Sequence, residues 1–466
     1  MTSRQPARQG KVPNPAELLF KFQIKDEIKA ARIEATMAYI EYVEEPKTSQ
    51  RRERFDLEFE MVPGDKEERH PKDPLPHPGR GLIFGGNRMN IGTQAVHIGL
   101  EWDTRTGAVT VPVYQTATFR HPGLGQSTGY DYSRSGNPTR QALEDGIARL
   151  DRAARGFAYS SGMAAIANLL LLFKSGDHII VTEDLYGGTC RLFDKIFSQY
   201  GLSFTYVDTS DTAAVRAAML PTTKAVFVET LTNPLLKFAD LPAIAAICQE
   251  NHLLLIADNT FLTPYLLRPL EQGADIAVYS ATKYLAGHND TVAGLVTVKD
   301  PQLAEQVYFH QNSVGATLGP QDSWLTIRGM KTLAVRLDRQ QENALIIATW
   351  LAAHPRITRV HFPGLADHPH HGLMKQNCGG FGAMIAFEVD NHALVEQVLL
   401  KTGLISFAES LGGVESLITF PEVQTHADIP PELRARLGIN NVLLRLSVGI
   451  EDVDDLIEDL RQALEG

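Results

Sequence analysis

The chain has 466 residues, which is too many for one small hydrophobic core and predicts two or three domains. Hydrophobic residues make up 44% of the sequence and charged residues 21%, values that are typical of a soluble globular protein. The formal net charge of −11 argues against a nucleic acid or an anionic membrane surface as the main partner.

The cysteines and the hydropathy pattern bear on the expected compartment. Cys190, Cys248 and Cys378 are too few for a disulfide framework and lack metal-ligand spacing, so we expect a reducing compartment and no metal site. No apolar run reaches the roughly 20 residues of a membrane span, and the N-terminus lacks the apolar segment of a secretory signal. These features predict a cytoplasmic protein.

Residues 1–88 differ from the rest of the chain. They are dense in charges of both signs, and proline and glycine gather near their end. Within them, residues 15–45 place apolar side chains on one face and predict a single amphipathic helix. We interpret this extension as an appendage without chemistry, or as sequence upstream of a native start at Met89.

From about residue 150 the sequence alternates between apolar runs and helix-like segments. The predicted strands are 156–160, 178–182, 225–230, 253–258 and 276–280, and helix-like segments between them include 164–173 and 241–250. Because the runs are continuously apolar, they predict a largely parallel sheet that is covered by helices on both faces. Ligands bind beyond the carboxyl ends of such strands, so chemistry is expected in the polar residues that follow them.

The pattern changes again after about residue 335. A long helix-like stretch, 336–353, precedes strand-like segments at 383–389 and 443–447 and a final helix at 452–464. This succession predicts a smaller α+β domain.

Three segments place reactive groups at the ends of predicted elements. Lys283, flanked by Ser280 and Thr282, follows the strand 276–280, where its amine can form an imine with an aldehyde cofactor. Asp258 ends the preceding strand, where a carboxylate can pair with a protonated pyridine nitrogen. Gly162 lies between a strand and an apolar helix, where free N–H groups form an anion site.

Several motifs, spaced along the chain in one order, resemble those of the Cys/Met-metabolism (transsulfuration) family of pyridoxal-phosphate (PLP) enzymes. The first three are Tyr132-Ser133-Arg134-x-x-Asn137-Pro138-Thr139, Ser161-Gly162-Met163-Ala164-Ala165 and Asp184-x-Tyr186-Gly187-Gly188-Thr189. The others are Asp258-Asn259-Thr260, Ser280-Ala281-Thr282-Lys283-Tyr284-x-x-Gly287-His288 and Arg445-x-Ser447-Val448-Gly449-Ile450-Glu451. The resemblance extends from about Met89 to the C-terminus. It implies a fold-type-I PLP-dependent transferase, with a mostly parallel central sheet between helices and a smaller C-terminal α+β domain.

The resemblance also implies the residues that hold the cofactor. It implies that Lys283 carries PLP as a Schiff base and shuttles protons, that Asp258 pairs with the pyridinium nitrogen, and that Tyr186 stacks on the ring. The remaining expected contacts are Gly162, Met163, Ser280 and Thr282 at the phosphate and Asn233, in Glu229-Thr230-x-x-Asn233-Pro234, near the phenolic oxygen.

For the substrate, the resemblance implies that Arg445 and Ser410 hold the α-carboxylate. Glu409 matches a residue that members handling cystathionine place near the distal ammonium group, and Arg191 is a candidate partner for the distal carboxylate. Methionine γ-lyases have an apolar residue at the first of these positions and a cysteine where this chain has Gly188. Both departures weigh against that activity.

The pair Tyr132 and Arg134 bears on assembly. In the family this pair reaches into a neighbouring subunit and completes its phosphate site, so a homo-oligomer is expected, with a tetramer built from dimers as the usual form. The predicted division is therefore an extension, 1–88, an arm, 89–148, a PLP-binding domain, 149–335, and a C-terminal domain, 336–466.

The catalytic residues predict a reaction class and leave the reaction itself open. We expect a cystathionine lyase, acting by β- or γ-elimination, with cystathionine γ-synthase and then O-acylhomoserine sulfhydrylase as alternatives. An aminotransferase of the same fold type fits the motifs around Tyr132 and Tyr186 less well. A non-enzymatic regulator is disfavoured because every expected catalytic residue is present.

Overall fold

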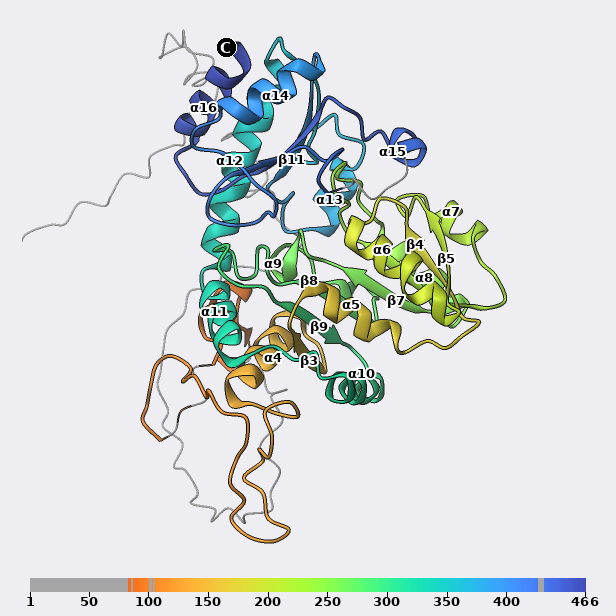
Figure 1. Ribbon diagram of the computed structural model, residues 1–466, viewed down its shortest axis with the longest axis vertical. Coiled ribbons are helices and arrows are strands. Elements are labelled where there is room, and N and C mark those ends of the chain that lie inside the picture. Colours follow the sequence, from red (N-terminus) through yellow and green to blue (C-terminus); the bar gives the residue numbers. More distant parts are fainter. Residues whose placement is uncertain (1–82, 85–86, 100–102, 104, 426–430) are drawn as a thin grey trace, which may run out of the picture. The chain divides into compact units, whose positions relative to one another are not determined.

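The computed structural model describes residues 83–84, 87–99, 103, 105–425 and 431–466. The predicted helix at 15–45 and most of the extension 1–88 lie outside these residues. The described part begins with a short antiparallel pair, β1 (Ile83–Phe84) and β2 (Asn87–Arg88), which is followed by α3 (Ile91–Val96). Residues 105–137 then form an irregular, mostly exposed segment that projects away from the sheets (Figure 1, orange).

A seven-stranded sheet with the order β3-β9-β8-β7-β6-β4-β5 forms the centre of the larger lobe. Its strands are β3 (Arg155–Tyr159), β4 (His178–Thr182), β5 (Ser203–Val207), β6 (Thr223–Glu229), β7 (Leu254–Asp258), β8 (Ile276–Ser280) and β9 (Gly294–Val298). Strands β4 to β8 pair in parallel, whereas β9 lies antiparallel between β3 and β8. The five predicted strands correspond to β3, β4, β6, β7 and β8, and β5 and β9 were not predicted.

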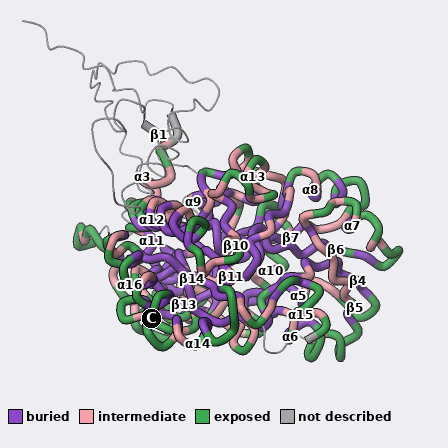
Figure 2. The backbone as a smooth tube through the Cα atoms, turned by 90° about the horizontal axis from the view of Figure 1, so that it is seen from above, coloured by how far each residue is buried: buried purple, intermediate pink, exposed green. Residues whose placement is uncertain are grey.

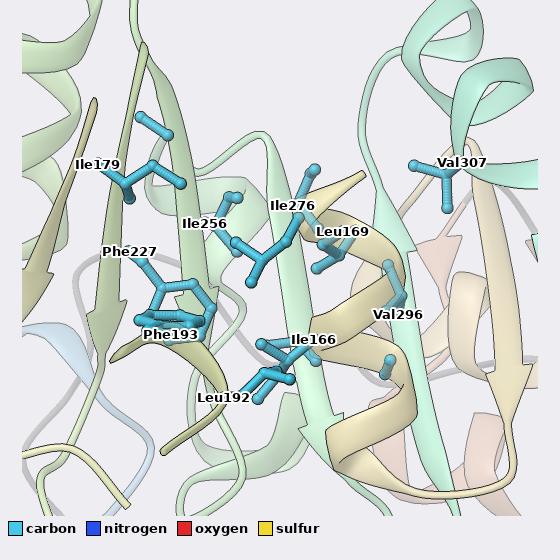
Figure 3. Packing of buried hydrophobic residues seen from close by; sticks show 14 of the residues in the cluster. Ile166, Leu169, Ile179, Leu192, Phe193, Phe227, Ile256, Ile276, Val296 and Val307 are labelled. Carbon is cyan, nitrogen blue, oxygen red and sulfur yellow. The ribbon is translucent and has the colours of Figure 1, made fainter. Parts of the chain in front are cut away.

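Helices cover both faces of this sheet. On one face lie α5 (Gly162–Leu170), α6 (Gly187–Lys195) and α10 (Pro301–Val314), and Figure 3 shows their side chains packed against the strands. Phe193 of α6, for example, meets Phe227 of β6 edge-on, with ring centroids 5.5 Å apart. On the other face α4 (Pro138–Asp151) contacts β3, and α8 (Leu241–Glu250) contacts β7.

A second sheet, with the order β10-β11-β14-β13-β12, belongs to the C-terminal part of the chain. Its strands are β10 (Ile357–His361), β11 (Met384–Val389), β12 (Ser406–Phe407), β13 (Leu417–Thr419) and β14 (Leu443–Ser447). The long helix α12 (Leu333–Ala353) packs on β10 and β11, α14 (His392–Lys401) packs on β11, and α16 (Val453–Glu465) packs against α12 and α14 (Figure 1). Figure 2 shows the buried residues gathered in the interior, and β14 is buried along its whole length.

Among the described residues, the remaining elements are five further helices and two helical turns. They are α7 (Thr212–Ala217), α9 (Thr263–Leu266), α11 (Pro320–Met330), α13 (His371–Asn377), α15 (Pro431–Leu437), and the 3-10 turns η1 (Phe197–Tyr200) and η2 (Pro269–Gln272). Within the described ranges, no helix combines the length and the apolarity that crossing a bilayer requires.

The architecture confirms the predicted fold class, a mostly parallel sheet between helices with a smaller C-terminal sheet. The helix-like stretch 336–353 is part of α12, and the segments 383–389 and 443–447 are β11 and β14. The two sheets fall on either side of the predicted boundary at 335/336, while the four-part division of the chain stays a proposal.

The buried carboxylate of Asp459 fixes residues 403–405, which lead into β12 and then to Glu409. Asp459 of α16 accepts the backbone N–H groups of Gly403, Leu404 and Ile405 at 2.7, 3.0 and 2.9 Å. Its side chain is 7% exposed, so water does not replace these bonds when they are lost.

We therefore predict that Asp459→Ala lowers the free energy of unfolding by roughly 3 kcal/mol or more, because three backbone N–H groups lose their acceptor and one buried polar group left unsatisfied costs about 1–3 kcal/mol. Asp459→Asn keeps one acceptor oxygen and should lose about half as much. Calorimetry at one protein concentration measures the effect, with the exposed Asp455→Ala of the same helix as control. Equal melting temperatures for Asp459→Ala and Asp455→Ala would contradict this account.

Candidate active site

A cavity of about 380 Å³ lies at the carboxyl ends of the central strands. Its volume is within the range of small-molecule sites. The large lobe contributes the ends of β6, β7 and β8 and the first residues of α5 and α6, and the smaller lobe contributes residues 409–411 and β14. Predicted site residues on its walls are Gly162, Met163, Tyr186, Asn233, Asp258, Ser280, Thr282, Lys283, Glu409, Ser410 and Arg445.

A wider, more open cleft of about 880 Å³ adjoins this cavity and shares Thr282, Val292, Glu409 and Ser410 with it. Its walls also carry the carboxylates Asp290, Asp322 and Glu415. The approach to the inner cavity is therefore acidic.

Three predicted site residues lie away from both spaces. Tyr132 and Arg134 belong to the exposed segment between α3 and α4, where Arg134 donates to the Asn312 carbonyl at 2.8 Å and its guanidinium lies 5.7 Å from the Tyr132 ring centroid. Arg191 is exposed on α6 and lines neither space. The roles predicted for these three residues stay predictions.

Lys283 lies in the turn that follows β8, and its amine points to the smaller lobe. The Nζ atom donates a hydrogen bond to Ser410 Oγ at 2.8 Å. Burial lowers the pKa of Lys283 to about 8, with a further lowering from Arg445 and an opposing effect from Glu409. This shift favours the uncharged amine, which is the nucleophilic form.

The turn that carries Lys283 is held by a buried arginine. Arg336 of α12 donates to the carbonyl oxygens of Tyr284 and Leu285 at 2.8 and 3.3 Å. Gly287 makes room for the guanidinium, because a Cβ atom there would lie 2.0 Å from Arg336 Nη1 and the residue has a φ of +69°. The long helix thus fixes the backbone from which Lys283 projects.

Asp258 ends β7 and is oriented by the threonine that follows it. The backbone N–H and the hydroxyl of Thr260 donate to Asp258 Oδ1 at 3.0 and 2.6 Å, and the N–H of Ser280 donates to Thr260 Oγ1 at 2.8 Å. Burial raises the pKa of Asp258 to about 6, against the effect of the Thr260 hydrogen bonds. A buried carboxylate with a raised pKa is stabilised by a cation bound opposite it.

The start of α5 forms an anion-binding cradle. Ser161 caps the helix by accepting the N–H of Ala164 at 3.0 Å, which leaves the first N–H groups, of Gly162 and Met163, without a partner inside the helix. A Cβ atom on Gly162 would lie 3.0 Å from the Ser280 Cβ, so glycine lets the start of α5 pack closely on the end of β8. Helix N-termini of this kind bind phosphate groups.

Arg445 of β14 supplies a buried positive charge. Its side chain is 2% exposed, and its two terminal nitrogens donate to Asn233 Oδ1 at 3.0 Å and to the Ser410 carbonyl at 2.9 Å. Its Nε atom has no hydrogen-bond partner among the described residues, and none of their carboxylates forms an ion pair with it. A buried guanidinium that has an unpartnered N–H group and no ion pair favours an anionic ligand beside it.

Sequence reasoning gave no role to Glu229, whose buried carboxyl also lines the cavity. It ends β6 directly beside Asp258 in the sheet register. Burial, reinforced by Asp258, raises the pKa of Glu229 well above its ordinary value. The signal available in the sequence was its position at the end of an apolar strand, next to the strand that ends in Asp258.

The residues of this cavity fit PLP on the structure's own terms. The anion-binding cradle at Gly162 suits a phosphate, the raised pKa of Asp258 suits a pyridinium partner, and the amine of Lys283 suits an aldehyde. Ser280 and Thr282 line the same cavity and can add hydroxyl groups.

Comparisons with known proteins agree with this assignment. The family model described as Cys/Met metabolism PLP-dependent enzyme matches residues 92–465. The cystathionine γ-synthase/O-acetylhomoserine (thiol)-lyase of Bacillus subtilis strain 168 is 52% identical over 81% of this chain and 96% of its own length. The cystathionine β-lyase of Lactococcus lactis subsp. cremoris strain MG1363 is 50% identical over 81% of this chain and 99% of its own length.

Among solved structures, cystathionine γ-lyase from Lactobacillus plantarum complexed with L-serine superposes with a TM-score of 0.79. It is 48% identical and covers 81% of this chain and 99% of its own. The family-model match begins at residue 92, shortly after the predicted extension 1–88, and includes every element that lines the cavity. The chain belongs to the Cys/Met metabolism family of PLP-dependent enzymes, as its motifs predicted.

Proposed function

We propose that this enzyme cleaves a carbon–sulfur bond of cystathionine by β- or γ-elimination. The observation that carries the proposal is that Glu409 lines the same cavity as Lys283 and Arg445. Cystathionine has an amino-acid group at each end, so it offers a carboxylate to Arg445 and a distal ammonium group to Glu409. Relatives that are about 50% identical carry lyase names, which supports the same reading.

PLP, when bound at Lys283, withdraws electrons from the substrate carbon and so acidifies its proton. Lys283 would then serve as the acid and base that moves protons between neighbouring carbons. Its pKa of about 8 suits both tasks near neutral pH, since either protonation state is accessible. Ser410 Oγ, which accepts a hydrogen bond from the amine at 2.8 Å, would hold this mobile group in line.

The substrate's α-carboxylate would be held by Arg445. Two of its nitrogens are already fixed by Asn233 and by the Ser410 carbonyl, so the guanidinium is oriented before substrate arrives. Ser410 has a φ of +95°, a conformation that costs a non-glycine residue energy and that presents its carbonyl to Arg445 and its hydroxyl to Lys283. We infer that this strained backbone is retained because it places both groups of Ser410 in the site.

The cofactor contacts follow the same logic. Asp258 would face the ring nitrogen, Gly162, Met163, Ser280 and Thr282 would hold the phosphate, and Asn233 would lie near the phenolic oxygen. Tyr186, which is 45% exposed at the mouth of the cavity, would close over the ring.

The alternative that a specific observation favours is cystathionine γ-synthase, which joins an O-acylhomoserine to cysteine. The B. subtilis relative with that activity in its name is 52% identical, slightly above the lyase relative. The same residues serve making and cleaving of the bond, so Glu409 and Arg445 fit both directions. The acidic outer cleft, with Asp290, Asp322 and Glu415, suits a substrate whose far end carries an ammonium group, as cystathionine does and the acyl end of an O-acylhomoserine does not.

Assembly and location complete the proposal. We infer a homo-oligomer, a tetramer built from dimers, in which Tyr132 and Arg134 complete the phosphate site of a neighbouring subunit. Their exposure in a segment that projects from the subunit supports this reading (Figure 1). A cytoplasmic location accords with the cysteine usage.

We predict that the purified enzyme forms keto acid from cystathionine alone. Pyruvate with homocysteine identifies β-elimination, and 2-oxobutyrate with cysteine identifies γ-elimination. Lys283→Ala should abolish both products because it removes the acid–base group. If cystathionine gives no keto acid while O-acylhomoserine plus cysteine gives cystathionine, the lyase proposal is wrong and the synthase is right.

A second prediction concerns the pH dependence of Lys283. Only the unprotonated amine reacts with an aldehyde, so the rate at which Lys283 of the cofactor-free protein captures PLP should rise with pH through about 8 and then level off. An ordinary lysine would continue to gain rate up to about pH 10.4. Stopped-flow absorbance measures this rate.

Glu409→Gln should move that midpoint to lower pH, because the Glu409 carboxylate raises the pKa of Lys283. The control is Glu415→Gln, which alters a carboxylate of the outer cleft that does not act on Lys283 and should leave the midpoint unchanged. A midpoint near 10, or an upward shift in Glu409→Gln, would contradict the proposed electrostatics.

A further inference from the structure

Glu229 is a buried acid in the cavity wall that the proposed chemistry does not use. It is the last residue of β6, and its side chain is 7% exposed. Among the described residues, no lysine, arginine or histidine forms an ion pair with it. A buried carboxyl in these surroundings is retained for the hydrogen bonds it makes.

Those hydrogen bonds come from the backbone of two predicted cofactor contacts. The N–H of Tyr186 donates to Glu229 Oε1 at 2.8 Å, and the backbone of Asn233 also acts on the carboxyl, whose pKa it lowers. Tyr186 precedes α6 as its N-cap residue and has no side-chain cap of its own. Glu229 is therefore the acceptor that fixes the backbone at the start of this helix.

The direction of the Tyr186 ring depends on that backbone. A Cβ atom on Gly188 would lie 2.5 Å from Tyr186 Cε1, so the ring lies directly over the first turn of α6. On the other side, Asn233 Oδ1 accepts a hydrogen bond from Arg445 Nη1 at 3.0 Å. Glu229 thus links the backbone that carries the Tyr186 ring with Asn233, whose side chain accepts the hydrogen bond from Arg445.

The neighbouring charge argues that Glu229 works as an acceptor and not as a second counter-ion. It is paired with Asp258 in the sheet register, and two ionised carboxylates side by side would repel each other. Burial and the nearby Asp258 raise the pKa of Glu229 well above its ordinary value. Asp258 then carries the negative charge, and Glu229 serves as a hydrogen-bond acceptor that positions the backbone.

We propose that Glu229 is a positioning residue that couples Tyr186 to Asn233, so that ring stacking and the orientation of Arg445 are set together. This inference rests on the proposed cofactor contacts of Tyr186 and Asn233. It does not depend on which carbon–sulfur bond the enzyme makes or breaks.

The test compares variants that keep or remove the acceptor at nearly constant volume. Glu229→Gln retains an acceptor oxygen, whereas Glu229→Met and Glu229→Leu retain none. The controls are Glu144→Gln and Glu144→Met, because the Glu144 carboxyl in α4 accepts the backbone N–H of Ala158 at 3.0 Å, pairs with Arg140 at 3.3 Å and does not line the cavity. PLP is titrated into each cofactor-free protein, and visible circular dichroism is recorded at equal cofactor occupancy.

For Glu229→Met or Glu229→Leu, whichever folds, we expect PLP to bind at least tenfold more weakly and the dichroism of the bound cofactor to fall. We expect a kcat loss of about tenfold to a hundredfold, the scale of a misplaced catalytic group. Glu229→Gln should lie within about threefold of the wild type, since the loss of a single neutral hydrogen bond is worth about that factor. Both Glu144 variants should lower the melting temperature and leave affinity and dichroism unchanged.

Two results would overturn the proposal. One is a folded Glu229→Met or Glu229→Leu with wild-type affinity and dichroism. The other is a Glu229→Gln as impaired as these variants, which would show that charge matters and not the acceptor. If the wild type makes no product from cystathionine or O-acylhomoserine, the proposed function fails, while the binding and dichroism comparisons still decide the role of Glu229.

Discussion

The hydrogen bond between the Lys283 amine and the Ser410 hydroxyl is the interaction on which the site depends. It joins the turn after β8 in the large sheet to the loop between β12 and β13 of the small sheet. It also brings the amine beside the buried guanidinium of Arg445. Burial and the positive charge of Arg445 lower the pKa of Lys283, so the amine can lose its proton. The two side chains then need not both carry a positive charge. The lowered pKa is thus a consequence of closing the two lobes around one cavity.

The parallel sheet explains why the other groups meet at this point. Strands β6, β7 and β8 run side by side in the same direction, so Glu229, Asp258 and Ser280 emerge along one edge. Each is then fixed by its neighbours: Thr260 ties Asp258 to Ser280, and Glu229 holds the backbone of Tyr186. The result is a row of oriented polar groups whose geometry is set before any ligand binds, which limits the entropy that binding costs.

The sequence predicted most of this arrangement for an identifiable reason. Lys283, Asp258 and Gly162 each follow a continuously apolar run, and such runs are the clearest sign of buried parallel strands. Strand β5 was missed because it alternates and is only half-buried at the sheet edge, and β9 because it begins with Gly294 and Thr297 interrupts its apolar run. The tie from Glu229 to the backbone of residues 186 and 233, and the clamp of Arg336 on the Lys283 turn, depend on contacts between distant segments. No local sequence pattern indicates these contacts. Arg191, chosen by its place after the Tyr186 motif, is exposed outside the cavity.

We propose that Lys283 is the residue that carries the cofactor, and one chemical experiment tests this most directly. Purified enzyme is reduced with borohydride, digested, and its peptides are mapped by mass spectrometry, with Lys283→Ala treated in parallel. The account predicts a pyridoxyl group on the peptide that contains Lys283 and none in the variant. A label on another lysine, or equal labelling of the variant, would contradict it.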